Sequence, residues 1–154
     1  MRFFFYGTLI PGSGNPVSEA LGKLLVRQGP ATARGRLYAI PDKQGHYPAL
    51  LPGKGSVHGL VFATLPGFDR SDLARMDAYE EFHPGNPVGS IYLRRKVAIR
   101  LMDGEQADVQ AYIFNRALPA GAQIIADGNF PAWLSRAESA AFGTKRPVSR
   151  IDCT

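Results

Sequence analysis

Residues 96–114, with the sequence KVAIRLMDGEQADVQAYIF, contain the clearest structural signal in this chain. Val97, Ile99 and Leu101 alternate with polar or small residues, which is the two-residue period of a strand with one buried face. Asp103-Gly104 then supplies a two-residue hairpin turn. The return strand has four apolar residues on one face and two aromatic residues on the other, namely Ala107, Val109, Ala111 and Ile113 against Tyr112 and Phe114. We therefore predict an antiparallel hairpin here.

Outside this hairpin, short apolar runs bounded by Gly or Pro predict four more strands. They are Arg2 to Tyr6, Ala31 to Ile40, Tyr47 to Leu51 and Ser56 to Leu65. Only two connections are long and helical enough to serve as parallel crossovers. The pattern therefore favours an α+β fold, in which a small mixed, mostly antiparallel β-barrel has short helices packed at its side.

Three helices are predicted from capping signals. The first follows Asn15 as cap and Pro16 as first helical residue, with an apolar stripe that reaches Leu25. The second opens with Asp69. The third runs from Pro131 to Phe142 and is ended by Gly143.

Length and composition indicate one ordinary globular domain. The 154 residues are 45% hydrophobic and 20% charged, which is enough for a real core. We expect a single domain over 1–154, with a loose tail from about 144. The aromatic run at 3–6 is too short for a secretory signal or a membrane span, and Cys153 is the only cysteine. A cytoplasmic protein with no membrane partner is the expectation.

The net charge of +5 does not identify a partner, because Lys and Arg are scattered along the chain. The densest group, Arg94, Arg95 and Lys96, lies on a predicted strand whose side chains alternate between faces, so it forms no compact patch. A partly solvated strand is the favoured interpretation. Nucleic-acid binding remains a rival hypothesis, since aromatic residues beside this group could stack on bases, but it is the less favoured one.

Several catalytic classes find no support. The chain has no Gly-x-Ser-x-Gly element, and His46, His58 and His83 show neither triad nor zinc-ligand spacing. Gly12-Ser13-Gly14 completes no dinucleotide or P-loop pattern. We therefore expect no metal and no cofactor.

Glu80 is the most informative single residue. In a helix opening at Asp69, the residues at i, i+3, i+4 and i+7 share one stripe, and they are Leu73, Met76, Asp77 and Glu80. A carboxyl turned towards an apolar interior has a raised pKa and is a candidate general acid/base. The alternative is that the helix frays before Pro84 and leaves Glu80 as a surface acid.

A second candidate is the junction of Tyr6, Gly7, Thr8 and Leu9, where a buried strand stops at a glycine. Successive free N–H groups in such a turn can bind a carboxylate or a developing oxyanion. The alternative is a plain strand-to-helix turn. Tyr112 could contact a substrate through its phenol, or could simply be a core aromatic.

These residues belong to a set of short motifs, ordered along residues 1 to 115, that resembles the γ-glutamylcyclotransferase-like proteins. That family includes γ-glutamylamine cyclotransferases and plant avirulence-induced-gene proteins. The matching pieces are Tyr6-Gly7-Thr8-Leu9, Gly35-Arg36-Leu37-Tyr38, Tyr47-Pro48-Ala49-Leu50, Val57-His58-Gly59-Leu60-Val61, Met76-Asp77-Ala78-Tyr79-Glu80, Tyr92-Leu93-Arg94 and Ala111-Tyr112. The chain departs from the family at Glu81, where members often carry Gly, and in the proline- and glycine-rich loop after it.

The resemblance implies an enzyme that needs no cofactor. Its barrel cavity would bind a γ-glutamyl amide, and release of an amine or amino acid would form 5-oxoproline. Glu80 would be the general acid/base, and the loop from Tyr6 to Leu9 would supply backbone donors. The alternative is a non-catalytic small-molecule binding or interaction domain on the same barrel. The motifs leave the γ-glutamyl compound and the oligomeric state open.

Overall fold

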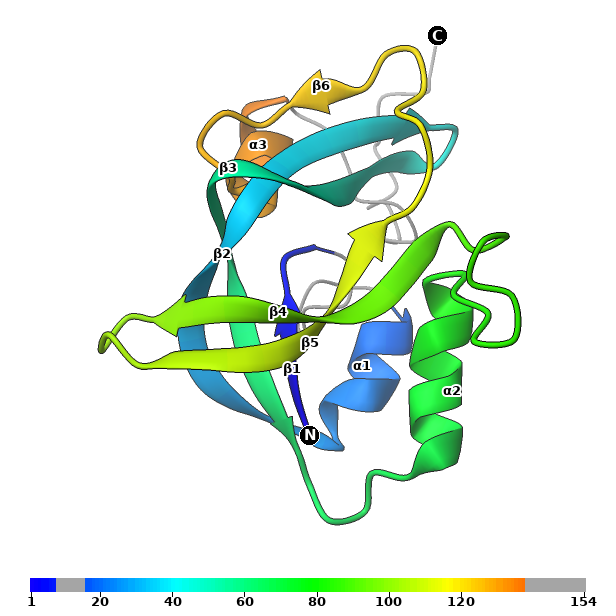
Figure 1. The fold of residues 1–154 in the computed structure, drawn as a ribbon, viewed down its shortest axis with the longest axis vertical. Helices are drawn as coiled ribbons and strands as arrows, with labels where there is room; N and C mark the ends of the chain where they lie inside the picture. The colour runs from blue at the N-terminus through cyan, green and yellow to red at the C-terminus, as the bar shows by residue number, and fades with distance from the viewer. Residues whose placement is uncertain (8–15, 138–154) are drawn as a thin grey trace, which may run out of the picture.

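The computed structural model describes residues 1–7 and 16–137. Figure 1 shows the strands as a curled sheet, with α1 and α2 at one side and α3 near the far end of the β2–β3 hairpin. In chain order the elements are β1 (Arg2–Phe5), α1 (Pro16–Gly22), β2 (Leu25–Asp42), β3 (Gly45–Thr64), α2 (Arg70–Tyr79), β4 (Tyr92–Leu101), β5 (Gln106–Phe114), β6 (Gln123–Ile124) and α3 (Phe130–Arg136). Among these helices, none is long and apolar enough to cross a membrane.

Strands β1 to β5 form a closed mixed barrel. The sheet order is β3-β1-β5-β4-β2-β6, and pairing of β2 with β3 closes the ring. Among the strands of the described residues, only the β1–β5 pair is parallel, and the other pairings are antiparallel. The predicted fold class is confirmed, and so is the hairpin, whose strands pair from Tyr92↔Phe114 to Arg100↔Gln106.

The β2–β3 hairpin corrects two sequence predictions. The predicted strands at Tyr47 to Leu51 and Ser56 to Leu65 are one 20-residue strand, because the segment 52–55 stays extended instead of turning. A register shift between Arg34 and Arg36, with Gly55 at φ 137, accommodates the proline and glycines there. Leu25 is a strand residue rather than part of the first helix, because it pairs with Thr64.

The last elements also differ from expectation. Strand β6 has two residues and pairs with β2 at Tyr38 and Ala39, and so short an element leaves no sequence periodicity. Helix α3 begins at Phe130, because the Asn129 side chain caps it by accepting from Ala132 N at 3.0 Å. The predicted end at Phe142 and the tail from 144 lie outside the described residues.

Two apolar clusters divide the core, and strand β1 contributes to both. Phe4 of β1 and Tyr6, which follows the strand, belong to the barrel core, a cluster with members from all five barrel strands and Phe130 of α3. Phe3 and Phe5 belong to the helix layer, a second cluster that includes Leu21 of α1, Met76 of α2, Tyr92, Tyr112 and Phe114. The candidate site lies where β1 ends and the two clusters meet.

Candidate active site

Helix α2 brings Glu80 to this junction. Asp69 caps its N-terminus, accepting from Ser71 N at 2.9 Å and Asp72 N at 3.1 Å, while the Asp72 carboxylate accepts from Asp69 N at 3.0 Å. This reciprocal capping box fixes where the helix begins. Met76 is fully buried and Asp77 is 5% exposed, so the predicted inward stripe is confirmed for these two residues, whereas Leu73 and Glu80 are only partly buried.

The C-terminus of α2 is closed without fraying. Glu80 is the C-cap residue, and its N–H bonds the Met76 carbonyl at 3.1 Å. Beyond it, Glu81 N donates to Ala78 O at 3.1 Å and Phe82 N donates to Asp77 O at 2.8 Å. This is a Schellman motif, and its left-handed position is occupied by Glu81 at φ 51. The departure from the family pattern therefore falls at the residue where glycine is favoured by backbone geometry.

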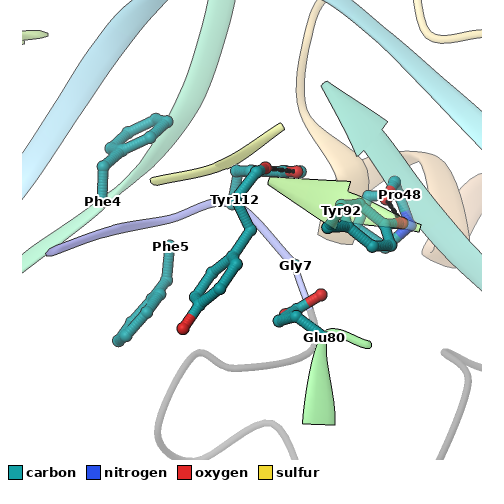
Figure 2. A pocket seen from close by; sticks show the side chains of 8 residues that line it. Phe4, Phe5, Gly7, Pro48, Glu80, Tyr92 and Tyr112 are labelled. Atoms are coloured by element: carbon teal, nitrogen blue, oxygen red, sulfur yellow. Dashed lines mark hydrogen bonds between the residues drawn. The ribbon is translucent and has the colours of Figure 1, made fainter. Parts of the chain in front are cut away.

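Glu80 lines two adjoining cavities. The inner one, of about 30 Å³, is shown in Figure 2. Its lining residues come from β1, β3, α2, β4 and β5, and are Phe4, Phe5, Tyr6, Gly7, Pro48, Glu80, Tyr92 and Tyr112. The outer one, of about 200 Å³, is lined by Asp42, Tyr47, Tyr79, Glu80, Glu81, Ile91 and Tyr92. Glu80 and Tyr92 therefore stand between a narrow inner space and a wider mouth.

The Glu80 carboxyl has an unusual environment. It forms no hydrogen bond or ion pair with any residue of 1–7 or 16–137, and its residue surface is only partly exposed. Burial raises the pKa of Glu80 to about 8, and the negative charge of Glu81 is the second cause. A carboxyl that titrates near neutrality and faces a cavity suits proton transfer.

The three tyrosines around it are held by hydrogen bonds through their hydroxyl groups. Tyr6 donates to the Tyr112 carbonyl, and Tyr92 donates to the Pro48 carbonyl at 2.5 Å. Tyr112 donates to Asp77 Oδ1 at 2.6 Å. Burial is the main cause that raises the pKa of all three, so they stay neutral at physiological pH. Each phenol oxygen can still accept a hydrogen bond, but none is a base.

Asp77 and Arg94 form a buried ion pair behind the site, which the sequence analysis missed. Arg94 Nε lies 2.9 Å from Asp77 Oδ1, and these side chains are 20% and 7% exposed. Arg94 also donates to Gln110 Oε1 at 3.2 Å. Its position opposite Tyr112 in the hairpin register was a signal that the two side chains share a face. The predicted partly solvated strand is confirmed, since Arg95 and Lys96 are exposed and Arg94 is partly exposed, but the ion pair of Arg94 was not predicted.

Gly7 lies two residues beyond the end of β1, in close contact with Pro48. A Cβ placed on Gly7 would lie 2.2 Å from Pro48 Cγ, so no larger residue fits without movement of the proline. Tyr6, Gly7, Glu80 and Tyr112, all predicted site residues, line the inner cavity together. Thr8 and Leu9 lie outside the described residues. Within residues 1–7 and 16–137, no three His, Cys, Asp or Glu side chains are grouped as metal ligands.

Comparison of the sequence with known protein families gives a match over most of the chain. The family described as "Gamma-glutamyl cyclotransferase, AIG2-like" matches residues 3–133. The chain belongs to this family. The predicted resemblance is confirmed, and the match extends past residue 115 into helix α3.

Related proteins of known sequence or structure match most of this chain. A γ-glutamylcyclotransferase family protein, ytfP, of Citrobacter rodentium is 30% identical over 136 residues, which are 88% of this chain and 97% of that protein. The solution structure of ytfP from Escherichia coli has 28% identity and a TM-score of 0.57, and covers 89% of this chain and 99% of its own. An AIG2-like protein of mouse, with 22% identity and a TM-score of 0.55, shares the fold over 77% of this chain and 83% of its own.

Proposed function

We propose that this protein is a γ-glutamyl cyclotransferase that releases an amine or amino acid from a γ-glutamyl amide and forms 5-oxoproline, with Glu80 as the general acid/base. The observation that carries the proposal is the Glu80 carboxyl, which has no described partner, faces two cavities and has a pKa raised to about 8. Family membership supplies the reaction class.

In the proposed reaction, ionised Glu80 takes a proton from the substrate's α-ammonium group. The freed amine attacks the γ-carbonyl carbon and closes a five-membered ring. As the amide C–N bond breaks, Glu80 gives this proton to the departing nitrogen. Glu80 then takes the second proton from the ring nitrogen, which becomes the lactam N–H, and passes it to the released amine, which leaves as an ammonium ion. A single carboxyl serves every proton transfer, and it ends in the state in which it began.

One carboxyl is sufficient because the nucleophile is tethered to its target. Well-oriented intramolecular attack is worth effective molarities on the order of 10⁵ to 10⁸ M, so no covalent nucleophile is required. An α-amine has a pKa of about 8. Proton exchange with Glu80, whose pKa is also about 8, is therefore nearly balanced in energy.

The cavity walls supply the rest of the proposed site. Tyr6, Tyr92 and Tyr112 fix the walls through hydrogen bonds that leave their phenol oxygens as acceptors. We assign the substrate's carboxylate or oxyanion to the backbone near Gly7, Thr8 and Leu9, because a strand end at a glycine can present free N–H groups.

The test is amine and 5-oxoproline release from a panel of γ-glutamyl amides, followed by mass spectrometry. Glu80→Gln should retain the fold and lose turnover by at least about 10²-fold, the usual contribution of a general acid/base. Glu105→Gln is the matched control, because it makes the same change at an exposed carboxylate in the β4–β5 turn. Its activity should equal that of the wild type.

Two outcomes would contradict the proposal. Wild-type rates in Glu80→Gln would remove the role of Glu80. Tight binding of γ-glutamyl amides by the wild type, with no amine released from any of them, would favour a non-catalytic binding domain on the same barrel.

A further inference from the structure

Strand β4 has a neighbouring strand on only one side for most of its length. It pairs with β5 over residues 92–100, whereas its pairing with β2 is confined to residues 99–101. Figure 1 shows β2 diverging from β4 beyond this short contact, as it continues in the β2–β3 hairpin. Within residues 1–7 and 16–137, no strand pairs with the other edge of β4 over residues 92–98. Every second residue there therefore presents its backbone N–H and C=O groups for an added strand.

A groove of about 450 Å³ lies along this unpaired edge. Its apolar lining comes from β3 and from the β4–β5 hairpin, and includes Leu50, Leu51, Pro52, Val97 and Ile113. Leu50 belongs to the barrel core, and Val97 and Ile113 pack against that cluster. The groove therefore lies over the barrel core and has an apolar floor. It shares no lining residue with the two cavities at Glu80.

Every charged side chain that lines this groove, among the described residues, is a cation. Arg34 comes from β2, Arg95 and Lys96 come from β4, and all three are exposed. None of them forms an ion pair or a side-chain hydrogen bond with a residue of 1–7 or 16–137. Arg34 also lines a neighbouring groove of about 680 Å³, where the other charged lining residue is Arg100. The two grooves therefore form one positive surface over β2 and β4.

The cations are arranged so that an added strand would meet them on both of its faces. Successive side chains of a strand point to opposite faces of the sheet, so Arg95 and Lys96 lie on different faces of β4. Leu93 and Val97, which also line the groove, are the neighbours of Arg95 on its own face. Carboxylates on an added strand could form cross-strand pairs with the two cations, while its apolar side chains contact the leucine and the valine.

A negatively charged partner fits this surface better than another part of the same chain does. In a second copy paired edge to edge, Arg95 and Lys96 would face the same cations, and like charges opposite each other are destabilising. The chain's own sequence over 144–152 carries three cations and one carboxylate, so its charge has the same sign as the groove. The unpaired cations therefore point to an acidic segment of a different protein.

Single-stranded nucleic acid would also be attracted by the cations, but it needs exposed rings on which its bases can stack. Among the described lining residues of the two grooves, the aromatic one is Phe114, and it is only 6% exposed. The apolar floor fits aliphatic side chains instead. A peptide is therefore the favoured anion.

We propose that the unpaired edge of β4 binds an extended, acidic peptide segment of a partner protein by strand addition. Backbone hydrogen bonds supply affinity, and alternate side chains supply specificity. Apolar side chains of the segment cover the groove floor, and its carboxylates pair with Arg34, Arg95 and Lys96. Six residues of such a segment span about 20 Å, which matches residues 93–98 of β4.

The test measures binding of a fluorescein-labelled heptapeptide in which Glu and Val alternate, by fluorescence anisotropy at low salt. Two matched peptides separate charge from backbone. One has Lys in place of each Glu, and the other carries a methyl group on every backbone nitrogen. We expect the acidic peptide to bind at least about tenfold more tightly than either control. Its binding should also slow amide hydrogen exchange at the alternate residues of 92–98 that do not bond to β5.

Protein variants test the cations. Arg95→Gln and Lys96→Gln should each weaken binding of the acidic peptide about threefold, and the double variant about tenfold. Both side chains are exposed, so the variants should retain the fold. Arg27→Gln is the matched control, because it removes an exposed cation of β2 that lines neither groove and forms no ion pair with a described residue. It should leave the affinity unchanged.

Equal binding of the acidic and lysine peptides would overturn the inference, as would full affinity of the methylated peptide or no binding of the acidic one. Tighter binding of an oligo-dT single strand than of the acidic peptide would also overturn it, and would assign the cations to nucleic acid. Slow exchange at every residue of 92–98 in the protein alone would mean that its own chain or a second copy already covers this edge, which is a further contradiction. Amine release plays no part in these measurements, so failure of the proposed function would leave them unchanged.

Discussion

The barrel core and the helix layer lie on opposite sides of the same strands, and they differ in chemistry. The barrel core includes Val109 and Ala111 of β5 together with Phe4 of β1. The helix layer, reached by the alternate residues of the same hairpin, encloses the Asp77–Arg94 pair and the Tyr112 hydroxyl. The side of the hairpin that faces the barrel core is stabilised by burial of apolar side chains. The side that faces the helix layer also depends on the ion pair and hydrogen bonds among its polar side chains.

This difference has a consequence for the site. Asp77 lies one turn before Glu80 on α2, and its carboxylate binds groups from both β4 and β5. The ion pair therefore ties the end of the helix to the hairpin. The polar side of the hairpin positions Glu80, and the apolar side provides the rigid barrel against which it is held.

The largest effect should follow loss of Asp77. Asp77→Ala leaves the Arg94 charge and the Tyr112 hydroxyl without their acceptor in a buried position, and should lower the free energy of unfolding by about 3–5 kcal/mol. Ile99→Val, in the barrel core, should lower it by only about 1 kcal/mol. Urea unfolding followed by fluorescence measures both. Equal losses would show that the two sides of the hairpin do not differ energetically.

The next effect concerns Gly7, where the two clusters meet. Gly7→Ala should displace Pro48 and, through the Pro48 carbonyl, the Tyr92 hydroxyl, at a cost of about 1–3 kcal/mol. The rate of amine release should also fall, because Pro48 and Tyr92 both line the inner cavity. Gly85→Ala is the control, since a Cβ there meets nothing within 4 Å. A fully active, stable Gly7→Ala would show that the strand end tolerates movement.

The sequence predicted the apolar face of the hairpin better than the polar contacts on its other face. Alternation in residues 96–114 and the capping signal at Asp69 act locally, so they identified the hairpin and the inward stripe of α2. The 20-residue strand β3 was missed because segment 52–55 has turn composition, and only pairing with β2 keeps it extended. Local propensity gives way to tertiary hydrogen bonding there.

In the candidate site too, local patterns predicted some residues, whereas contacts between distant elements were missed. Glu80 could be singled out because helical periodicity predicts it on the same face as Met76 and Asp77, which are buried. The partner of Asp77 could not be found in this way, because Arg94 lies 17 residues along the chain on another element. The contact of Gly7 with Pro48 likewise joins β1 to β3, and no local pattern reports it.

The buried carboxyl of Glu80 should make the stability of the protein depend on pH. Between pH 4.5 and about 8, folded Glu80 keeps a proton that the unfolded chain has lost, so its contribution to stability falls as the pH rises through that range. Relative to wild type, Glu80→Gln should therefore gain about 2 kcal/mol between pH 4.5 and pH 9, after allowance for its residual solvent contact. Urea unfolding at the two pH values measures this gain. A constant difference would mean that Glu80 is not desolvated.

The smallest effect should come from Glu81, where backbone and charge can be separated. Glu81→Gly removes the strain of a left-handed residue at φ 51 and should stabilise the protein by about 0.5–1 kcal/mol, whereas Glu81→Gln keeps the strain and should not. Both variants remove a negative charge that raises the pKa of Glu80, so in both the ascending limb of kcat/KM should move to lower pH.

The unfolding curve therefore reports the backbone strain at Glu81, and the pH profile reports the effect of its charge on Glu80. A shift of the ascending limb in Glu81→Gly alone would assign the effect to backbone geometry, and would remove the electrostatic link between Glu81 and Glu80. A shift in both variants, with stabilisation only in Glu81→Gly, would mean that the charge of this strained residue adds to burial in raising the pKa of the neighbouring carboxyl.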